Sequence, residues 1–458
     1  MKARSAAQGR SSVGGGGSHG ISRGAMTPQD HLIVVAAVPG DRAADLRAFL
    51  ATMTLPGLPG AADPANAILP FGRFDTIHFA RLLVLEDNTL GDRAVYPNLR
   101  KTDPIYLCLM IDCDGEATEL MVRIARECPA LAQAFAFCAD FQAGGDLERW
   151  MAAHRVASAA SYVNWVGRTA VQAREEARLS ELLRDALPQV TAREPQAMLQ
   201  ALRAAVGPRL SLTPIPPTPV AWRNANRFHL FAPIVVAAAL LVFIPWVTIP
   251  VAVIGLTLAL MALRRRELTD PIVENPYDPA WVARLRLLED HDVTNQYTAM
   301  GSIKPGRFRL GLELAILHVI DWAARHIFTR GGLGRIGTIH FAHWVLIDDR
   351  RRAFFCSNYD GGHEAYMDDF INKAGFGLNL SFSSAIAYPQ TDWLIKKGAW
   401  REMDFKRFQR RHQIPTDVWY KAYPGLTTRD LARNTRIRNG FEKPEMSDDE
   451  IRRWLAEI

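Results

Sequence analysis

The sequence has few cysteines, and their spacing pairs none of them. The five thiols form no Cys-x-x-Cys pattern and lie at unrelated intervals: Cys108, Cys113, Cys128, Cys138 and Cys356. An odd number of cysteines at such intervals argues against a disulfide framework and indicates a reducing compartment. The cytoplasm is the simplest compartment of that kind.

A recognisable nucleic-acid-binding motif is also absent from the sequence. The net charge of +6 is spread along the chain, which favours adhesion to an anionic membrane surface over nucleic-acid binding. Residues 1–27 lack an apolar segment and are basic and rich in Gly and Ser. They match neither a secretory signal nor a folded element, and we expect a disordered tail there.

Charged residues are missing from Phe228 to Leu263, where no Asp, Glu, Lys or Arg occurs. About 20 apolar residues cross a bilayer as a helix, so this run is long for one crossing and short for two complete ones. Pro245 and Pro250 interrupt the run near its middle and favour two short helices that form a hairpin. A single kinked transmembrane helix is the alternative.

Both flanks of this apolar run are basic. Arg223 and Arg227 precede it, and Arg264, Arg265 and Arg266 follow it. Lys and Arg prefer the cytoplasmic face of a membrane, so both flanks are expected on one side. The sequence therefore predicts a membrane protein with both globular halves on the cytoplasmic side.

The two halves contain an internal repeat. The word TIHFA occurs at Thr76–Ala80 and again at Thr338–Ala342, and Asp114-Gly115 corresponds to Asp360-Gly361. Apolar and amphipathic runs predict the order β-α-β-β-α-β in each half, the ferredoxin-like arrangement. The expected strands are 31–38, 76–85, 104–113, 134–141, 296–303, 338–347, 353–359 and 379–387, and the expected helices are 41–53, 116–127, 307–328 and 363–374.

Two ferredoxin-like sheets can pack their bare faces together. The expected fold class is therefore α+β, with two ferredoxin-like βαββαβ repeats that form an intramolecular α+β barrel interrupted by a membrane helical hairpin. The long helix 307–328 suits either a core or a membrane-surface position. The expected segments are a tail (1–27), a first repeat (28–205), a linker (206–227), a hairpin (228–263), a linker (264–295) and a second repeat (296–458).

This arrangement resembles the dimeric α+β barrel superfamily, which includes dye-decolourising peroxidases and chlorite-dismutase-like proteins that bind haem. The run Ser357-Asn358-Tyr359-Asp360-Gly361 is similar to the GxxDG motif of the peroxidases, with Ser357 in place of the first glycine. The segments GTIHFAHWVLID, SNYDG and HQIPTDVWYKAYPGLTTRDL also resemble uncharacterised bacterial membrane-associated proteins of this architecture. The first likeness implies haem and an oxidoreductase, and the second implies a fold without a known reaction.

Candidate site residues lie where the second copy has gained polar groups. We predict Asp360, His363 and Asn358 as catalytic residues and His340 as a cofactor ligand, because the second copy has a hydroxyl, an amide and a phenol that can donate, and a histidine that titrates near neutral pH. The alternatives are a core histidine in each TIHFA word and a turn-and-cap role for each Asp-Gly. The spacing of His363, Asp368 and Asp369 predicts no metal site.

Two functions follow from these observations. The first is a membrane-tethered, haem-dependent, peroxidase-like oxidoreductase. The second is a non-enzymatic barrel that binds an apolar ligand, another small molecule or a protein partner at the membrane surface. No unambiguous haem histidine separates them, and the oligomeric state is left open.

Overall fold

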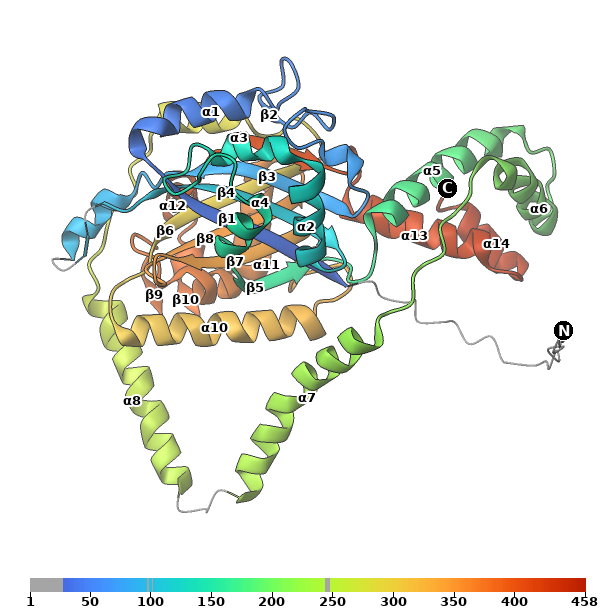
Figure 1. The fold of residues 1–458 in the computed structure, drawn as a ribbon. Coiled ribbons are helices and arrows are strands. Elements are labelled where there is room, and N and C mark those ends of the chain that lie inside the picture. Colours follow the sequence, from blue (N-terminus) through green and yellow to red (C-terminus); the bar gives the residue numbers. More distant parts are fainter. Residues whose placement is uncertain (1–27, 97–98, 101, 244–247) are drawn as a thin grey trace, which may run out of the picture.

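The computed structural model describes residues 28–96, 99–100, 102–243 and 248–458, and Figure 1 shows their arrangement. The tail expected over residues 1–27 lies outside the described residues. The chain is an α+β protein in which helices surround two larger β-sheets, and β9 (Thr391–Asp392) and β10 (Lys396–Lys397) form a separate two-stranded sheet. This confirms the expected fold class at that level.

The first sheet has five strands in the order β1-β4-β3-β11-β2. These strands are β1 (Gln29–Val38), β4 (Ile105–Asp114), β3 (Ile77–Leu85), β11 (Val418–Lys421) and β2 (Gly60–Ala61). Neighbouring strands are antiparallel except for β11 and β2. The three long strands fall on the apolar runs of the first half, and β3 is buried along its whole length.

The second sheet has four antiparallel strands in the order β5-β7-β8-β6. These strands are β5 (Ser158–Val163), β7 (Ile339–Ile347), β8 (Arg352–Asp360) and β6 (Thr294–Ser302). Strand β5 comes from the first half of the chain, whereas β11 of the first sheet comes from the second half. Each half therefore gives one strand to the other half's sheet.

The exchanged segments bridge both sheets. The Val35 N–H donates to the carbonyl of His154 (3.0 Å) beside β1, and the chain then crosses to pair as β5 with β7. In the second half the Ile414 N–H donates to the carbonyl of Thr298 (2.8 Å) before the chain becomes β11. Each of these contacts is an isolated β-bridge, Val34 with Arg155 and Ala299 with Gln413. The two sheets thus do not form the expected closed barrel.

Two expected strands are wrong. Residues 134–141 begin in the short helix α3 (Ala132–Phe135) and continue in turns. Residues 379–387 begin in the last turn of α11 (His363–Phe382) and also continue in turns. A short apolar run fits a helix or a strand equally well. The strand positions that these runs were expected to fill are taken by the exchanged segments, which lie further along the chain.

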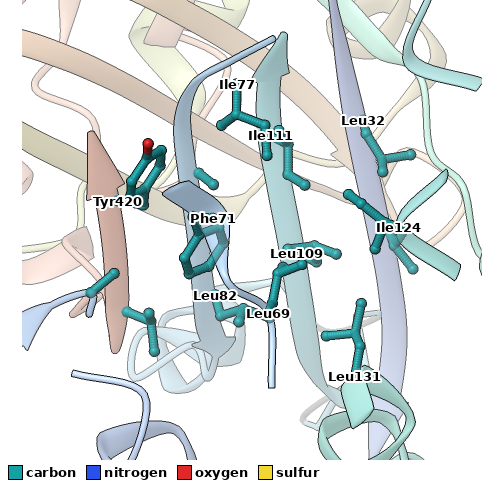
Figure 2. Packing of buried hydrophobic residues seen from close by; sticks show 14 of the residues in the cluster. Leu32, Leu69, Phe71, Ile77, Leu82, Leu109, Ile111, Ile124, Leu131 and Tyr420 are labelled. Atoms are coloured by element: carbon teal, nitrogen blue, oxygen red, sulfur yellow. The ribbon is translucent and has the colours of Figure 1, made fainter. Parts of the chain in front are cut away.

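The hydrophobic core lies on the faces of both sheets and between them. Figure 2 shows the first sheet, where Leu32, Leu82 and Leu109 come from neighbouring strands and Phe71 stacks on Tyr420 of β11 at a ring distance of 5.2 Å. A third cluster joins side chains from both sheets. Because apolar burial contributes roughly 25 cal/mol per Å², each sheet is stabilised by its contact with the other.

Helices cover the outer faces and build a separate lobe (Figure 1). Helices α1 (Ala43–Ala51), α2 (Ala117–Glu127) and α4 (Leu147–Ala153) lie on the first sheet, and α10 (Arg307–His326), α11 and α12 (Glu402–His412) lie around the second. The lobe consists of α5 (Ala170–Ala186), α6 (Pro195–Val206), α13 (Thr428–Glu442) and α14 (Asp448–Leu455).

Two helices project from one side of the body (Figure 1). They are α7 (Val220–Phe243) and α8 (Thr248–Thr269). Among the described residues, α8 alone is long and apolar enough to cross a membrane, judged by length and composition. Helix α8 continues beyond Leu263, so the start of the expected linker 264–295 is helical.

Candidate functional site

His340 and Asp360 form a hydrogen-bonded pair at the end of the second sheet. His340 Nε2 lies 2.7 Å from Asp360 Oδ1, and Asp360 Oδ2 accepts from the backbone N–H of Thr428 at 2.8 Å. Thr428 is the first residue of α13, so the carboxylate links a β-bulge in β7 to the start of a helix. Both side chains are buried.

The first half repeats this arrangement. His78 Nε2 lies 2.9 Å from Asp114 Oδ1, and Asp114 Oδ2 accepts from the N–H of Ala170 at the start of α5 (2.8 Å). Strand β3 has a register shift at His78, as β7 has at His340. The same hydrogen bonds in both halves favour the structural alternative for these residues, because satisfying a helix N-terminus is a need of the fold.

The space beside His340 is small. A cavity of about 20 Å³ is lined by both TIHFA histidines and by Tyr423, whose hydroxyl lies 3.0 Å from His78 Nδ1. That volume holds about one water molecule. The aromatic rings of Phe79 and Phe341 close the space, each 5.3 Å from the histidine of the other half. As arranged, these residues do not fit a haem.

The other predicted site residues do not line this cavity. His363 is buried at the start of α11, with its ring 5.8 Å from that of Tyr297. Neither ring nitrogen has a hydrogen-bond partner among the described residues, and Nδ1 lies 3.7 Å from Glu364. The structure therefore brings His340 and Asp360 together, while His363 and Asn358 lie in separate surroundings. The catalytic assignment stays a prediction.

Asn358 belongs to a buried polar network between the sheets. Its Oδ1 accepts from Arg81 Nη2, and its Nδ2 donates to Asp112 Oδ2 at 3.1 Å. The other oxygen of Asp112 lies 2.6 Å from His343 Nε2. Burial alone raises the pKa of Asp112, but His343 and Arg81 outweigh it and hold that pKa below its usual value.

Sequence reasoning missed three members of this network. Arg81 and His343 each follow a TIHFA word, and Asp112 and Asn358 are equivalent positions two residues before Asp-Gly. Across the interface the two halves thus present complementary groups at equivalent positions. The signal was present, since aligning the two copies shows Arg opposite His and Asp opposite Asn. The hydrogen bonds of this buried network fix the relative position of the two sheets, although His343 Nδ1 has no hydrogen-bond partner among the described residues.

A cleft lies where α8 enters the body. It has a volume of about 400 Å³ and is bordered by the end of α8, the segment 270–276, the start of α10, residues 387–391 and α12. Its charged lining consists of Lys304, Arg309, Arg401, Arg407, Glu267, Asp270, Glu274 and Asp404. This cleft could not be predicted from the sequence, because its walls come from five separate segments.

Most acidic groups in the cleft are already engaged. Glu267 accepts hydrogen bonds from the backbone N–H groups of Trp393 and Leu394, both at 2.8 Å. Asp270 Oδ2 accepts from Arg309 Nη2 at 2.5 Å and lies 3.8 Å from Lys304 Nζ. Arg401 is paired with Asp404 at 2.9 Å.

Two guanidinium groups in the cleft can still bind a further hydrogen-bond acceptor. Arg309 is 2% exposed, and its Nη1 has no hydrogen-bond partner among the described residues. Arg407 forms no ion pair within the described part of the chain. Burial, with Arg309 nearby, lowers the pKa of Lys304 to about 8. An anion bound beside these groups would restore that pKa and satisfy the guanidinium.

No family model matches the chain, and no curated protein or solved structure matches it. The class of protein is therefore defined by its fold. It is an α+β body of two larger sheets with exchanged strands, from which an apolar helix projects. What the protein binds or does has to be inferred from the site.

Proposed function

We propose that this is a non-enzymatic, membrane-anchored binding protein whose ligand site is the cleft at the root of α8. The root of a projecting helix is the end that joins the body, which for α8 is its C-terminal end. The observation that carries the proposal is a buried arginine, Arg309, which lines the cleft of about 400 Å³ and whose Nη1 has no hydrogen-bond partner among the described residues. A buried charged donor without a partner is costly, so a ligand that accepts from it is stabilised. We expect that ligand to carry an anionic group, with phosphate as its simplest form.

The apolar-ligand alternative has less support. A mainly apolar cavity lined by Met300, Trp344 and Phe355 has a volume of only about 50 Å³. Small-molecule sites usually enclose about 300–1,000 Å³. The cleft at the root of α8 falls within that range, and its lining is charged. We therefore propose a polar ligand in place of the apolar ligand expected from the sequence.

The anchor in this proposal is a hairpin of α7 and α8 that enters the bilayer from the cytoplasmic side. Both helices leave the same side of the body (Figure 1), and both flanks of the apolar run are basic. At the root of α7, His229 Nδ1 lies 2.8 Å from His326 Nε2 of α10. At the root of α8, Asp270 binds Arg309 at the other end of α10. Two helices rooted on one helix suit a hairpin better than a single span.

The body in this proposal consists of two duplicated ferredoxin-like units that exchange their last strands. Support comes from the strand orders β1-β4-β3-β11 and β6-β8-β7-β5, in which corresponding elements occupy corresponding places. The matched His-Asp pairs support it as well. The likeness to the dimeric α+β barrel superfamily, and with it haem and peroxidase activity, stays a prediction. A visible spectrum of the detergent-purified protein tests it.

Phosphate binding tests the ligand site. The full chain in detergent is heated with increasing inorganic phosphate, and chloride at equal ionic strength is the reference. A ligand that binds only the folded state at about 100 times its Kd adds about 2.7 kcal/mol, so Tm rises with phosphate. Arg407→Gln should weaken the rise without unfolding the protein, because Arg407 is exposed.

The matched control is Arg307→Gln, which removes an exposed arginine from α10 outside the cleft. It should leave the phosphate response unchanged. Equal Tm values in phosphate and chloride, or an equal response in both variants, would refute the site.

Reporter fusions test the anchor. A reporter active only outside the cytoplasm, fused at residue 210 or after residue 458, should stay silent at both places. Signal from one fusion alone would establish a single crossing.

A further inference from the structure

A short loop beside α8 displays apolar and basic side chains to solvent. It joins β9 (Thr391–Asp392) to β10 (Lys396–Lys397). The side chains of Trp393 and Ile395 are 43% and 48% exposed, and both lysines of β10 are exposed. A loop of this composition has no reason within the fold to present a tryptophan.

The loop is held in its conformation by strain and by specific contacts. Trp393 and Leu394 have φ values of 57° and 60°, in the left-handed region that non-glycine residues rarely adopt. Their N–H groups both donate to the Glu267 carboxylate of α8 at 2.8 Å. Such strain persists only where surrounding contacts enforce it and is common at functional positions. The exposed Trp393 side chain is therefore displayed by a fixed turn.

The loop lies at the boundary between the apolar and polar parts of α8. Arg264 is the first charged residue after the apolar run, and its Nη1 lies 2.7 Å from Asp392 Oδ1. Its guanidinium also lies 5.8 Å from the centre of the Trp393 ring. If α8 crosses a bilayer, Arg264 lies at the level of the lipid headgroups, where tryptophan is enriched. Trp393 then lies at the same level.

Helix α10 supplies a second surface at that level. It runs along the body between the roots of α7 and α8 (Figure 1). Its buried face contains Arg309, Glu313, Leu317 and Ala324. The opposite face contains Ala315, Val319 and Trp322, and Val319 is 64% exposed.

The charge pattern of α10 also fits a surface helix. No acidic residue lies on the outer face of α10, and Arg307 and Arg325 flank that face at either end. An apolar stripe with basic ends is typical of a helix that lies in a membrane interface.

We propose that the β9–β10 loop and the outer face of α10 form a second membrane contact, which seats the body on an anionic phospholipid surface. The exposed basic side chains near this surface match anionic headgroups: Arg265, Arg266, Lys396 and Lys397. The inference rests on the proposed anchoring, because α7 and α8 bring the surface to the bilayer. It adds a fixed orientation, with the cleft at the root of α8 facing the headgroup region.

Fluorescence depth measurements test the second contact. The five native cysteines are buried, so an environment-sensitive label reacts with one introduced cysteine. The labelled positions are Ile395→Cys on the loop, Val319→Cys on α10 and Leu58→Cys as the control. Leu58 is 43% exposed and lies just before β2, on the far side of the body (Figure 1). The full chain is placed in vesicles of phosphatidylcholine and phosphatidylglycerol that contain a nitroxide lipid labelled near the headgroup.

We expect the nitroxide to quench the labels at 395 and 319 several-fold more than the label at 58. The double substitution Lys396→Glu and Lys397→Glu should reduce quenching at 395 in vesicles with phosphatidylglycerol. In pure phosphatidylcholine it should have little effect, because the attraction to anionic lipid is then absent.

Alkaline extraction separates failure of this inference from failure of the anchor. Protein that resists extraction but shows equal quenching at 395, 319 and 58 refutes the second contact alone, and such a surface would serve a protein partner instead. If alkaline buffer removes the protein from the vesicles, the membrane anchor is refuted. The second membrane contact is then refuted with it.

Discussion

His343 of β7 and Asp112 of β4 meet across the interface between the two sheets, with His343 Nε2 2.6 Å from Asp112 Oδ1. They come from opposite halves of the chain, and both side chains are buried. The pair therefore holds the two sheets in one relative position. The pair can stabilise the fold only when both halves of the chain are present.

We predict that Asp112→Asn lowers the free energy of unfolding by about 3–5 kcal/mol, because it leaves buried donors of His343 and Asn358 without a charged acceptor. Chemical denaturation of the full chain in detergent measures the change. Asp349→Asn is the matched control, since the side chain of Asp349 is 98% exposed. The control should change stability by less than about 0.5 kcal/mol. Equal effects in the two variants would show that the network does not hold the sheets.

His31 of β1 lies beside this network, with its ring 4.7 Å from that of His343, and it predicts a pH dependence. Burial and the nearby His343 lower the pKa of His31 to about 4. A group whose pKa is lowered in the folded state contributes stability above its unfolded pKa, and this is lost as the pH falls through the folded value. The window for His31 therefore runs from about 6.5 down to 4.

The loss from His31 over that window is at most about 3.5 kcal/mol, since each pKa unit corresponds to about 1.4 kcal/mol. Denaturation at several pH values should show a smaller loss in His31→Gln than in the unchanged protein. Curves of unfolding free energy against pH that run parallel for the two proteins would contradict the role of His31.

The matched His-Asp pairs give a prediction that separates structure from chemistry. Asp114→Asn and Asp360→Asn each weaken the acceptor for a histidine and for a helix N-terminus, and each should cost about 1–3 kcal/mol. If these residues serve the fold, both variants lose similar stability and neither changes the content of any copurified ligand. A loss of ligand in Asp360→Asn alone would restore Asp360 as a catalytic or binding residue.

The sequence was informative where the local pattern decides the structure. The run at 76–85 was expected to be a strand, and β3 covers Ile77–Leu85 because its side chains are apolar on both faces. The exchanged strands could not be found in this way. Ser158–Val163 and Val418–Lys421 are short, and their partners lie in the other half of the chain. Local periodicity carries no information about which sheet a strand joins.

The site was harder to predict than the fold. His340 and Asp360, which were predicted for one pocket, lie within hydrogen-bond distance of each other, and their roles as cofactor ligand and catalytic residue stay predictions. The cleft at the root of α8 was missed because Arg309 and Arg407 lie on different helices and come together only in the folded body. From the sequence alone, a single arginine on an amphipathic helix is predicted to be exposed to solvent. Its burial is a property of the tertiary structure.

The exchange of strands leads to the last prediction, which concerns a fragment of residues 28–205. In the full chain the first sheet continues from β3 to β11, whose Tyr420 packs on Phe71. The fragment lacks β11 and leaves β5 without β7, so it has two unpaired strand edges and an exposed sheet face. Unpaired edges and apolar faces cause association. We expect the fragment alone to be insoluble or self-associating on a size-exclusion column.

Coexpression with residues 264–458 should rescue the fragment, because that piece supplies β7 and β11 without the apolar run. The two pieces should elute together as one complex, with backbone amides of β3 protected from hydrogen exchange. Coexpression with the same piece carrying Val418→Pro is the control, since proline removes a donor and clashes within a paired strand. That variant should rescue less of the fragment. A well-dispersed NMR spectrum from residues 28–205 as a monomer would show that the first sheet needs no strand from the second half.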